Sequence, residues 1–438
     1  MKQTFRILLL TAVLSSAILG MHAQNSGINS PYSRYGWGIL SETASGFNKG
    51  MAGAGYGMRQ GNIINYQNPA AYSEIDSLTL LFDAGISLQN GTYKAGGKSK
   101  NAQNSTLDYL AAAFRLGKGL GFSLGLRPYS HIGYDFSSTL NLDDIDGYGS
   151  KTSTSTYHGE GGLHLVYAGI GYSPIKNLSV GATAKYIWGD YAHSSSVTNS
   201  DNNVFTLTRR YTASLNAATF DFGLQYTYQI NKKDQVTLGL TYGIYNRTNQ
   251  RATFVNMQSG TGTISSDTVN VSNAFQLPTT IGAGLTWNHG YKWIVSADYT
   301  LQRWAKCRFP ELQEKNGLSI YKVGWNSFKN RQQFALGLQY MPNPRSIKVR
   351  DHICYRAGVS YTTPYTKVNG KDGPKSYMAT VGVGLPIVNK HNNRSEANIS
   401  VQYEHCDSKA VSAIKEDYFR LCLGLTFNAN WFSKWKVQ

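Results

Sequence analysis

The sequence has few charged residues and few cysteines. Charged side chains make up 15% of its 438 residues, against roughly 25% in an average soluble domain, which disfavours a molecule built mainly of solvent-exposed helices. The four cysteines stand far apart, at Cys307, Cys354, Cys406 and Cys422. Their spacing matches neither a disulfide framework nor a metal site.

Long hydrophobic runs are also missing from most of the chain. After residue 23 no stretch of apolar residues reaches the roughly 18 that a membrane-spanning helix needs, and the mean hydropathy is −0.34. Transmembrane helices are therefore excluded. A transmembrane β-barrel is not, because its strands alternate lipid-facing apolar residues with small or polar lumenal ones and so have a low average hydropathy.

The amino terminus has the features of a secretory signal peptide over residues 1–23. Lys2 and Arg6 supply positive charge ahead of an apolar run from Ile7 to Leu19, which is too short to span a bilayer. Cleavage after Ala23 would leave a mature chain that begins near Gln24, and no cysteine follows for a lipid anchor. The sequence therefore predicts an exported protein.

The net charge of the chain is strongly positive. It is +17 in full, or +15 once Lys2 and Arg6 leave with the signal. An exported chain meets anionic lipid and lipopolysaccharide before any nucleic acid. We therefore expect the outer-membrane surface to be the partner of this charge, and no nucleic-acid binding.

Apolar residues recur at every second position over segments of about ten residues, the length of a tilted membrane-spanning strand. In residues 235–248, for example, one face carries Val236, Leu238, Leu240, Tyr242 and Ile244, and the other carries only small or polar residues. The pattern predicts fourteen strands that start near Leu78, Leu107, Leu120, Leu163, Leu178, Ala218, Gln235, Pro278, Trp293, Gln332, Tyr355, Tyr377, Ala397 and Tyr418.

The connections between these strands alternate between short and long. The long ones, taken as surface loops, are 91–105, 133–162, 192–217, 249–276, 305–329, 364–375 and 405–417. Short turns on one side and long loops on the other are typical of outer-membrane barrels, whereas a soluble β-sandwich gives no reason for strict alternation. The predicted fold is all-β: a transmembrane antiparallel barrel of about fourteen strands over residues 78–427, integral to the outer membrane of a Gram-negative cell, with a periplasmic tail at 428–438.

Residues 24–77 precede the first strand and differ from it in composition. They contain Ser30-Pro31-Tyr32-Ser33-Arg34-Tyr35-Gly36 and a series of glycines that allow close contact with a barrel wall. We predict that this segment folds into the lumen as a hatch.

The chain resembles the FadL/TodX family of outer-membrane transporters for long-chain fatty acids and hydrocarbons. The resemblance rests on Met51-Ala52-Gly53-Ala54-Gly55 and Asn68-Pro69-Ala70, which stand ahead of a fourteen-strand pattern. It implies a hatch in which Gly53, Gly55, Asn68, Pro69 and Ala70 form the motif. The Ser30–Gly36 opening and the Trp431–Trp435 tail are similar to Bacteroidetes members, a branch in which relatives also serve as accessory barrels of secretion machinery.

Apparent catalytic and metal-binding patterns lack their structural context. Gly121-Phe122-Ser123-Leu124-Gly125 matches the nucleophile elbow of hydrolases, but it lies inside an alternating strand. The histidines lack ligand spacing, and Asp143, Asp144 and Asp146 do not complete a calcium loop. We expect no enzyme activity, no catalytic residue, no metal and no cofactor, although an outer-membrane protease or phospholipase is the enzyme class to keep in view.

Two functions remain for such a barrel. One is passive uptake of a hydrophobic, fatty-acid-like small molecule through a lumenal pocket, driven by burial of its chain at about 0.8 kcal/mol per methylene. The other is a non-transporting role as an accessory or scaffold barrel that holds outer-membrane protein partners in a secretion or assembly complex. We expect the first function. A continuous apolar pocket in the lumen would support it, whereas a tightly filled lumen with a large exposed apolar patch on the loops would support the second.

Overall fold

The computed structural model describes residues 28–430, except 143–150, 202, 245, 249, 261, 316–317, 388–394 and 409–413. The signal peptide predicted at residues 1–23 lies outside the described residues. So does the tail from residue 431, while the last strand includes residues 428–430. Among the described helices none is long and apolar enough to cross a membrane.

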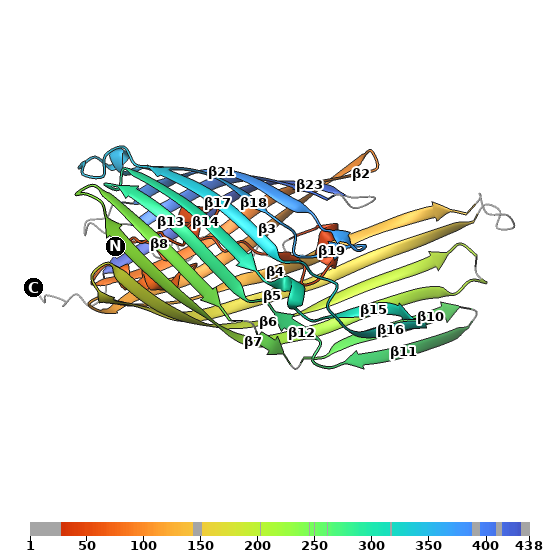
Figure 1. Ribbon diagram of the computed structural model, residues 1–438. Coiled ribbons are helices and arrows are strands. Elements are labelled where there is room, and N and C mark those ends of the chain that lie inside the picture. The colour runs from red at the N-terminus through yellow and green to blue at the C-terminus, as the bar shows by residue number, and fades with distance from the viewer. Residues whose placement is uncertain are drawn as a thin grey trace, which may run out of the picture.

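Fourteen of the described strands form a closed antiparallel barrel (Figure 1). Each pairs with its neighbours in the sequence, and the first and last also pair, from Thr79↔Asn430 to Lys94↔Lys415. The predicted fold class is confirmed. The barrel strands are β2 (Thr79–Ala95), β3 (Lys98–Gly117), β4 (Leu120–Asn141), β5 (Thr152–Ile175), β6 (Leu178–Asn199), β7 (Thr206–Gln229), β8 (Asp234–Gly243), β13 (Thr280–His289), β14 (Trp293–Gln302), β17 (Arg331–Tyr340), β18 (Cys354–Thr362), β21 (Lys375–Ile387), β22 (Ser395–Asp407) and β23 (Lys415–Asn430).

The alternation of side chains along each strand explains why the wall closes. In β8, Leu238, Leu240 and Tyr242 point outward and are 41–49% exposed, while Thr237 points inward and is buried. An outer face of large apolar residues suits lipid, and an inner face of small and polar residues leaves space in the lumen. That space is where the hatch lies.

The barrel has a short-turn end, where for example β3 meets β4 at residues 118–119, and a long-loop end with additional elements. The additional elements extend or cover the wall there. They are β9 (Asn246–Thr248), β10 (Ala252–Gly260), β11 (Thr263–Val271), β12 (Phe275–Leu277), η3 (Trp304–Lys306), β15 (Phe309–Lys315), β16 (Leu318–Gly324), β19 (Lys367–Val368) and β20 (Lys371–Asp372); η4 (Val349–His352) lies in the connection from β17 to β18, at the short-turn end.

Predicted surface loops contain strand that continues the barrel wall. The described parts of the segments 91–105, 133–142, 151–162 and 192–217 largely continue the ladders of β2 to β7, so that β5 starts at Thr152 and not near Leu163. The prediction ended each strand where outward apolar residues stop. The strands continue beyond the last outward apolar residue because the N–H and C=O groups of neighbouring strands still pair with each other. This backbone pairing does not depend on an apolar side chain on the outer face.

At this level β4, β5 and β6 approach one another closely, and we call this region the pinch. A register shift in β4 lies between Pro128 and Ser130, and Gly161, Gly162 and Gly189 have positive φ values of 118°, 143° and 149°. A Cβ at Gly189 would lie 2.1 Å from the carbonyl oxygen of Gly162. Only glycine permits this approach of the two strands.

We expect Gly189→Ala to destabilise the barrel by about 1 to 3 kcal/mol, because the added Cβ meets backbone and the φ value is strained. The measurement is urea unfolding in detergent, followed by tryptophan fluorescence. Gly117→Ala is the control, because no atom lies within 4 Å of its added Cβ. Equal stability of the two variants would contradict the account of the pinch.

Candidate functional site

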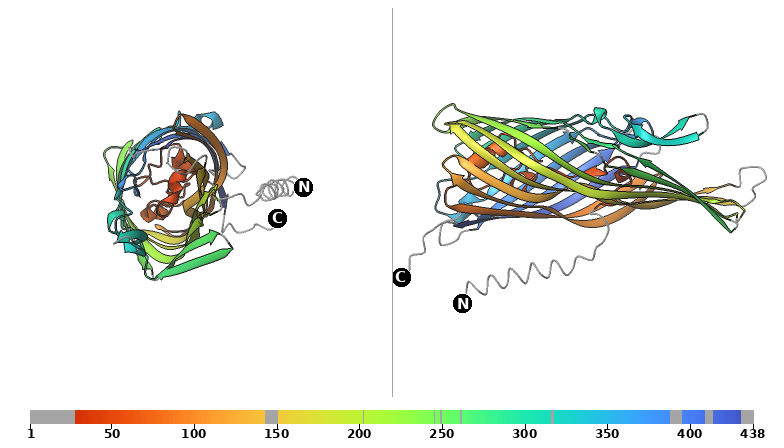
Figure 2. Two further views of the ribbon diagram at one scale, coloured as in Figure 1. Left: turned by 90° about the vertical axis from the view of Figure 1, so that its right-hand side faces the viewer. Right: turned by 90° about the horizontal axis from the view of Figure 1, so that it is seen from below.

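The hatch lies inside the barrel, where the view along the axis shows it as the red and orange segment within the ring of strands (Figure 2). Its elements are short: η1 (Pro31–Arg34), β1 (Ile39–Leu40), α2 (Gly46–Lys49) and η2 (Pro69–Glu74). It starts near the long-loop end, where Ser30 Oγ donates to Glu416, and reaches the short-turn end before β2 begins. The hatch thus runs the length of the lumen.

The predicted Asn68-Pro69-Ala70 motif begins η2 and lies against β5, β6 and β7. Asn68 is fully buried; its Oδ1 accepts from Ala70 N at 3.1 Å, and its Nδ2 donates to Tyr56 O at 3.0 Å and to Leu224 O at 3.3 Å. The wall residue that faces Asn68 at this contact is a glycine, Gly223 of β7. A Cβ at Gly223 would lie 2.2 Å from Asn68 Oδ1, so the hatch touches the strand backbone directly.

The predicted glycines Gly53 and Gly55 lie on a second turn of the hatch. The backbone N–H groups of Gly55 and Tyr56 both donate to Asp298 Oδ2 on β14, at 2.6 and 2.9 Å. Gln67 donates to Gly53 O at 2.8 Å and so ties this turn to the one that holds Asn68. The structure therefore brings the five motif residues into one connected region, and their role in function stays a prediction.

Ion pairs that the sequence did not indicate also fix the hatch to the wall. Lys49 is 5% exposed, and its Nζ lies 2.7 Å from Asp108 on β3. Glu42 lies 3.5 Å from Arg420, whose guanidinium also contacts Glu404 at 2.6 Å. These partners are far apart in the sequence, so no local pattern could have identified them.

The space left between hatch and wall is small and polar. A cavity of about 130 Å³ lies between them, lined among others by Glu42, Arg127, Lys185, Asp298 and Arg331. Lys185 and Asp221 form an ion pair at its edge. Pockets for drug-sized ligands are typically about 300 to 1,000 Å³ and mostly apolar. This cavity does not fit a hydrocarbon chain.

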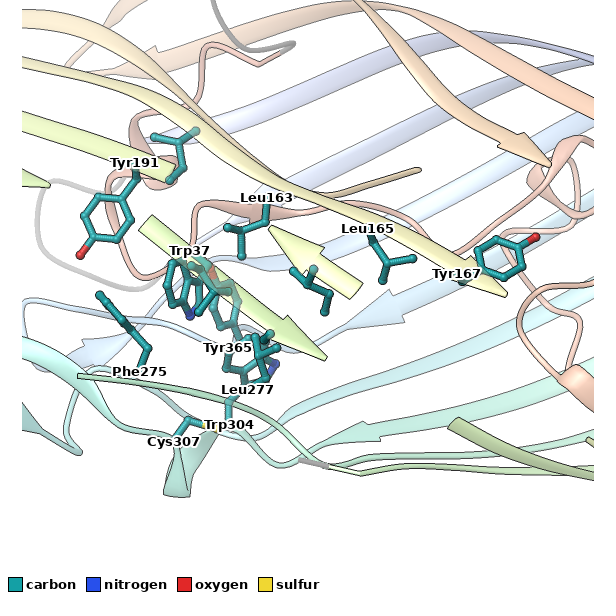
Figure 3. Packing of buried hydrophobic residues seen from close by; sticks show 14 of the residues in the cluster. Trp37, Leu163, Leu165, Tyr167, Tyr191, Phe275, Leu277, Trp304, Cys307 and Tyr365 are labelled. Atoms are coloured by element: carbon teal, nitrogen blue, oxygen red, sulfur yellow. The ribbon is translucent and has the colours of Figure 1, made fainter. Parts of the chain in front are cut away.

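Aromatic side chains close the lumen toward the long-loop end (Figure 3). Trp37 of the hatch is completely buried, with ring centroids of Tyr191 and Phe275 at 5.7 and 4.8 Å. Further rings come from the loop elements, including Trp304 and Tyr365 at 4.9 Å from each other. We call this cluster the aromatic seal; it comprises Trp37, Tyr191, Phe275, Trp304, Phe309, Phe328 and Tyr365.

The barrel wall has a seam between β3 and β4. The two strands pair only from Leu110↔Leu126 to the turn, and the described residues show no pairing between them above that level. Figure 1 shows the orange β2–β3 hairpin separating there from the yellow β4 and β5. The hatch fills the seam, because β1 pairs with β4 through Ile39↔His131 and Leu40↔Ser130, and Asn29 bonds to Asn104 on β3.

Comparison with known proteins identifies the family. A family model described as BamG matches residues 3–438, nearly the whole chain. The chain belongs to the BamG family. No curated protein matches the sequence.

Solved structures with the same fold are distant in sequence from this BamG-family chain. A Pseudomonas aeruginosa FadL homologue has a TM-score of 0.59 at 13% identity, over 90% of this chain and 99% of that one. The P. putida toluene transporter TodX has a TM-score of 0.57 at 14% identity, and the match covers 90% of this chain and 100% of that one. The Ralstonia pickettii toluene transporter TbuX has a TM-score of 0.57 at 14% identity, and the match covers 88% of this chain and 98% of that one. The FadL/TodX resemblance is thus confirmed as a likeness of fold, and the Bacteroidetes assignment stays a prediction.

The residues considered for catalysis lie in ordinary wall positions. Ser123 is fully buried in β4 and lies 3.2 Å from Tyr167 Oη, with no sharp turn around it. Asp143, Asp144 and Asp146 lie outside the described residues. Within the described ranges no three His, Cys, Asp or Glu side chains converge as metal ligands would.

We expect Asp298→Ala to destabilise the folded protein by about 2 to 4 kcal/mol, because it leaves the buried N–H groups of Gly55 and Tyr56 without their acceptor. Urea unfolding, together with the rate at which protease cleaves the hatch, measures the effect. Asp267→Ala on the exposed β11 is the matched control. A variant at Asp298 as stable and as protease-resistant as this control would show that the contact does not hold the hatch.

Proposed function

We propose that this BamG-family chain is a non-transporting accessory barrel, integral to the outer membrane of a Gram-negative cell with its long-loop end outside. It would hold protein partners in an outer-membrane assembly or secretion complex. The observation that carries the proposal is the filled lumen. The hatch runs through the lumen, the cavity described between it and the wall is polar, and the aromatic seal lies toward the long-loop end.

The energetics of the lumen support a permanently closed barrel. A hydrophobic solute gains about 0.8 kcal/mol per buried methylene, but to pass it would have to displace the hatch and separate the largely buried pair Lys49–Asp108 and the half-buried pair Arg420–Glu42. A buried charge that loses its partner is destabilising by about 3 to 5 kcal/mol. Several such contacts would have to open together, since they all hold one hatch.

The long-loop end offers surface for a partner. The β10–β11 hairpin extends the sheet beyond β7, and β11 pairs with β10 along its whole length. Ile264 on this hairpin is 76% exposed. Backbone groups on the free side of an edge strand can pair with an added strand of another protein.

A second candidate is passive passage of hydrophobic small molecules; TodX and TbuX, which share this fold, are toluene transporters. The seam between β3 and β4 favours it, because displacement of the hatch from β4 would open the wall sideways. A fatty-acid-like ligand is the finer form of this candidate.

Purification of the full chain from its own outer membrane in mild detergent, followed by native mass spectrometry, separates the two functions. The accessory role predicts a stoichiometric protein partner that is lost when residues 252–271 are replaced by a short turn, with the barrel still folded. A chain that purifies alone with a bound hydrocarbon or lipid in the lumen would overturn it in favour of passage.

Cys307 reports whether the aromatic seal opens. This thiol is 1% exposed, and burial raises its pKa to about 12, so little reactive thiolate is present at pH 8. In a variant with the other three cysteines changed to serine, we expect maleimide to label Cys307 at least about 100-fold more slowly than in the unfolded chain. Toluene should leave the rate unchanged.

The control for this labelling is Ser266→Cys on the exposed β11, in a background with all four native cysteines changed to serine. It should react at the rate of a free thiol with or without toluene. Acceleration at Cys307 alone on addition of toluene would contradict the closed seal and support the second candidate.

A further inference from the structure

The outer face of the barrel has a large hollow beside the seam. It has a volume of about 1210 Å³ and is lined by residues of β3 to β7 and of the segment 250–253. A smaller hollow of about 370 Å³ adjoins it and shares Glu160, Ala192 and Arg210 with it. Gly161 and Gly162 line the hollow and have no side chain to fill it.

The position of this hollow relative to the membrane follows from the strands that form it. Along β5, Val166 and Ile170 are exposed apolar residues on the outer face, and Glu160 and His164 follow on the same face toward the long-loop end. Along β7, Phe220 and Phe222 are exposed in the same way, and Arg210 follows. The hollow therefore begins where the lipid-facing belt ends, at the level of lipid headgroups.

Charged side chains of both signs line the hollow without partners of their own. Arg210, Arg251, Glu160 and Asp190 are exposed, and the side chains of these four form no ion pair or hydrogen bond with another described residue. Elsewhere on the chain charged groups do pair, as Lys94 does with Asp417 at 2.9 Å. The four groups are thus available to a ligand.

We propose that this hollow binds the phosphorylated sugar headgroup of a glycolipid in the surrounding outer leaflet. Arg210 and Arg251 bind phosphate, for which a guanidinium offers paired donors. Glu160 and Asp190 accept hydrogen bonds from sugar hydroxyls. Leu107 and Leu126, at the lower edge of the hollow, contact the first methylenes of the acyl chains. This site rests on the outer-membrane location and orientation of the proposed function, but it does not depend on the accessory role.

The geometry favours a membrane lipid over a soluble anion. The hollow is several times larger than a phosphate ion requires, and its lower edge is continuous with the lipid-facing belt. Two arginines and two carboxylates together fit a headgroup that carries both phosphates and hydroxyls. They fit a simple anion less well, because the carboxylates would repel it.

The test measures lipid binding to the full-length barrel in nanodiscs by native mass spectrometry. Three probes are compared: a phosphorylated outer-leaflet glycolipid, the same glycolipid after phosphatase treatment, and inorganic phosphate. For the wild-type chain we expect the phosphorylated glycolipid to bind at least about 10-fold more tightly than either of the others. Arg210→Gln/Arg251→Gln should lose that difference.

Two further variants make the test specific. Arg345→Gln/Arg350→Gln removes two exposed arginines at the short-turn end and should bind as the wild type does. Glu160→Gln/Asp190→Asn should weaken glycolipid binding with or without phosphates. Retention of heat-modifiable migration on gels confirms that each variant is folded.

The proposal is overturned if Arg210→Gln/Arg251→Gln binds the phosphorylated glycolipid as tightly as the wild type does. It is also overturned if inorganic phosphate binds the wild type as tightly as the lipid, since the site would then recognise a soluble anion.

Discussion

The structure depends on one constraint: polar groups that the barrel encloses are stable only where the hatch or the wall supplies partners inside it. The inner face of the wall is made of small and polar residues, which leaves both space and unsatisfied donors and acceptors in the lumen. The hatch supplies the complement. Gly223 gives room for Asn68, and Asp298 accepts from the backbone of Gly55 and Tyr56. Wall and hatch therefore satisfy each other's buried polar groups.

The same constraint explains the seam. Above Leu110 and Leu126 the edges of β3 and β4 face each other without pairing among the described residues. Natural proteins pair or cover exposed strand edges, and here β1 of the hatch pairs with part of the β4 edge while the hydroxyl of Ser33 bonds to Gly133 on β4. A segment that satisfies backbone groups of the wall is a structural part of it, which agrees with an accessory barrel better than with a loosely held plug.

Much of the fold could be predicted from the sequence because lipid contact imposes a period of two. Strand starts such as those of β4, β6 and β14 were predicted at the residues where the structure has them. The prediction was wrong above the lipid belt, where β5 runs through Thr152–Gly162 without outward apolar residues. The hatch motif could be located by resemblance. Its ion pairs and the aromatic seal could not, because Lys49 and Asp108, or Trp37 and Phe275, meet only in the folded barrel.

Ion conductance of the full-length chain in a planar lipid bilayer tests the central claim most directly. The account predicts no steady conductance, because the hatch fills the lumen, and a large one when residues 30–76, which include Trp37 of the aromatic seal, are replaced by a short flexible linker. A steady, porin-like conductance of the unaltered chain would contradict it.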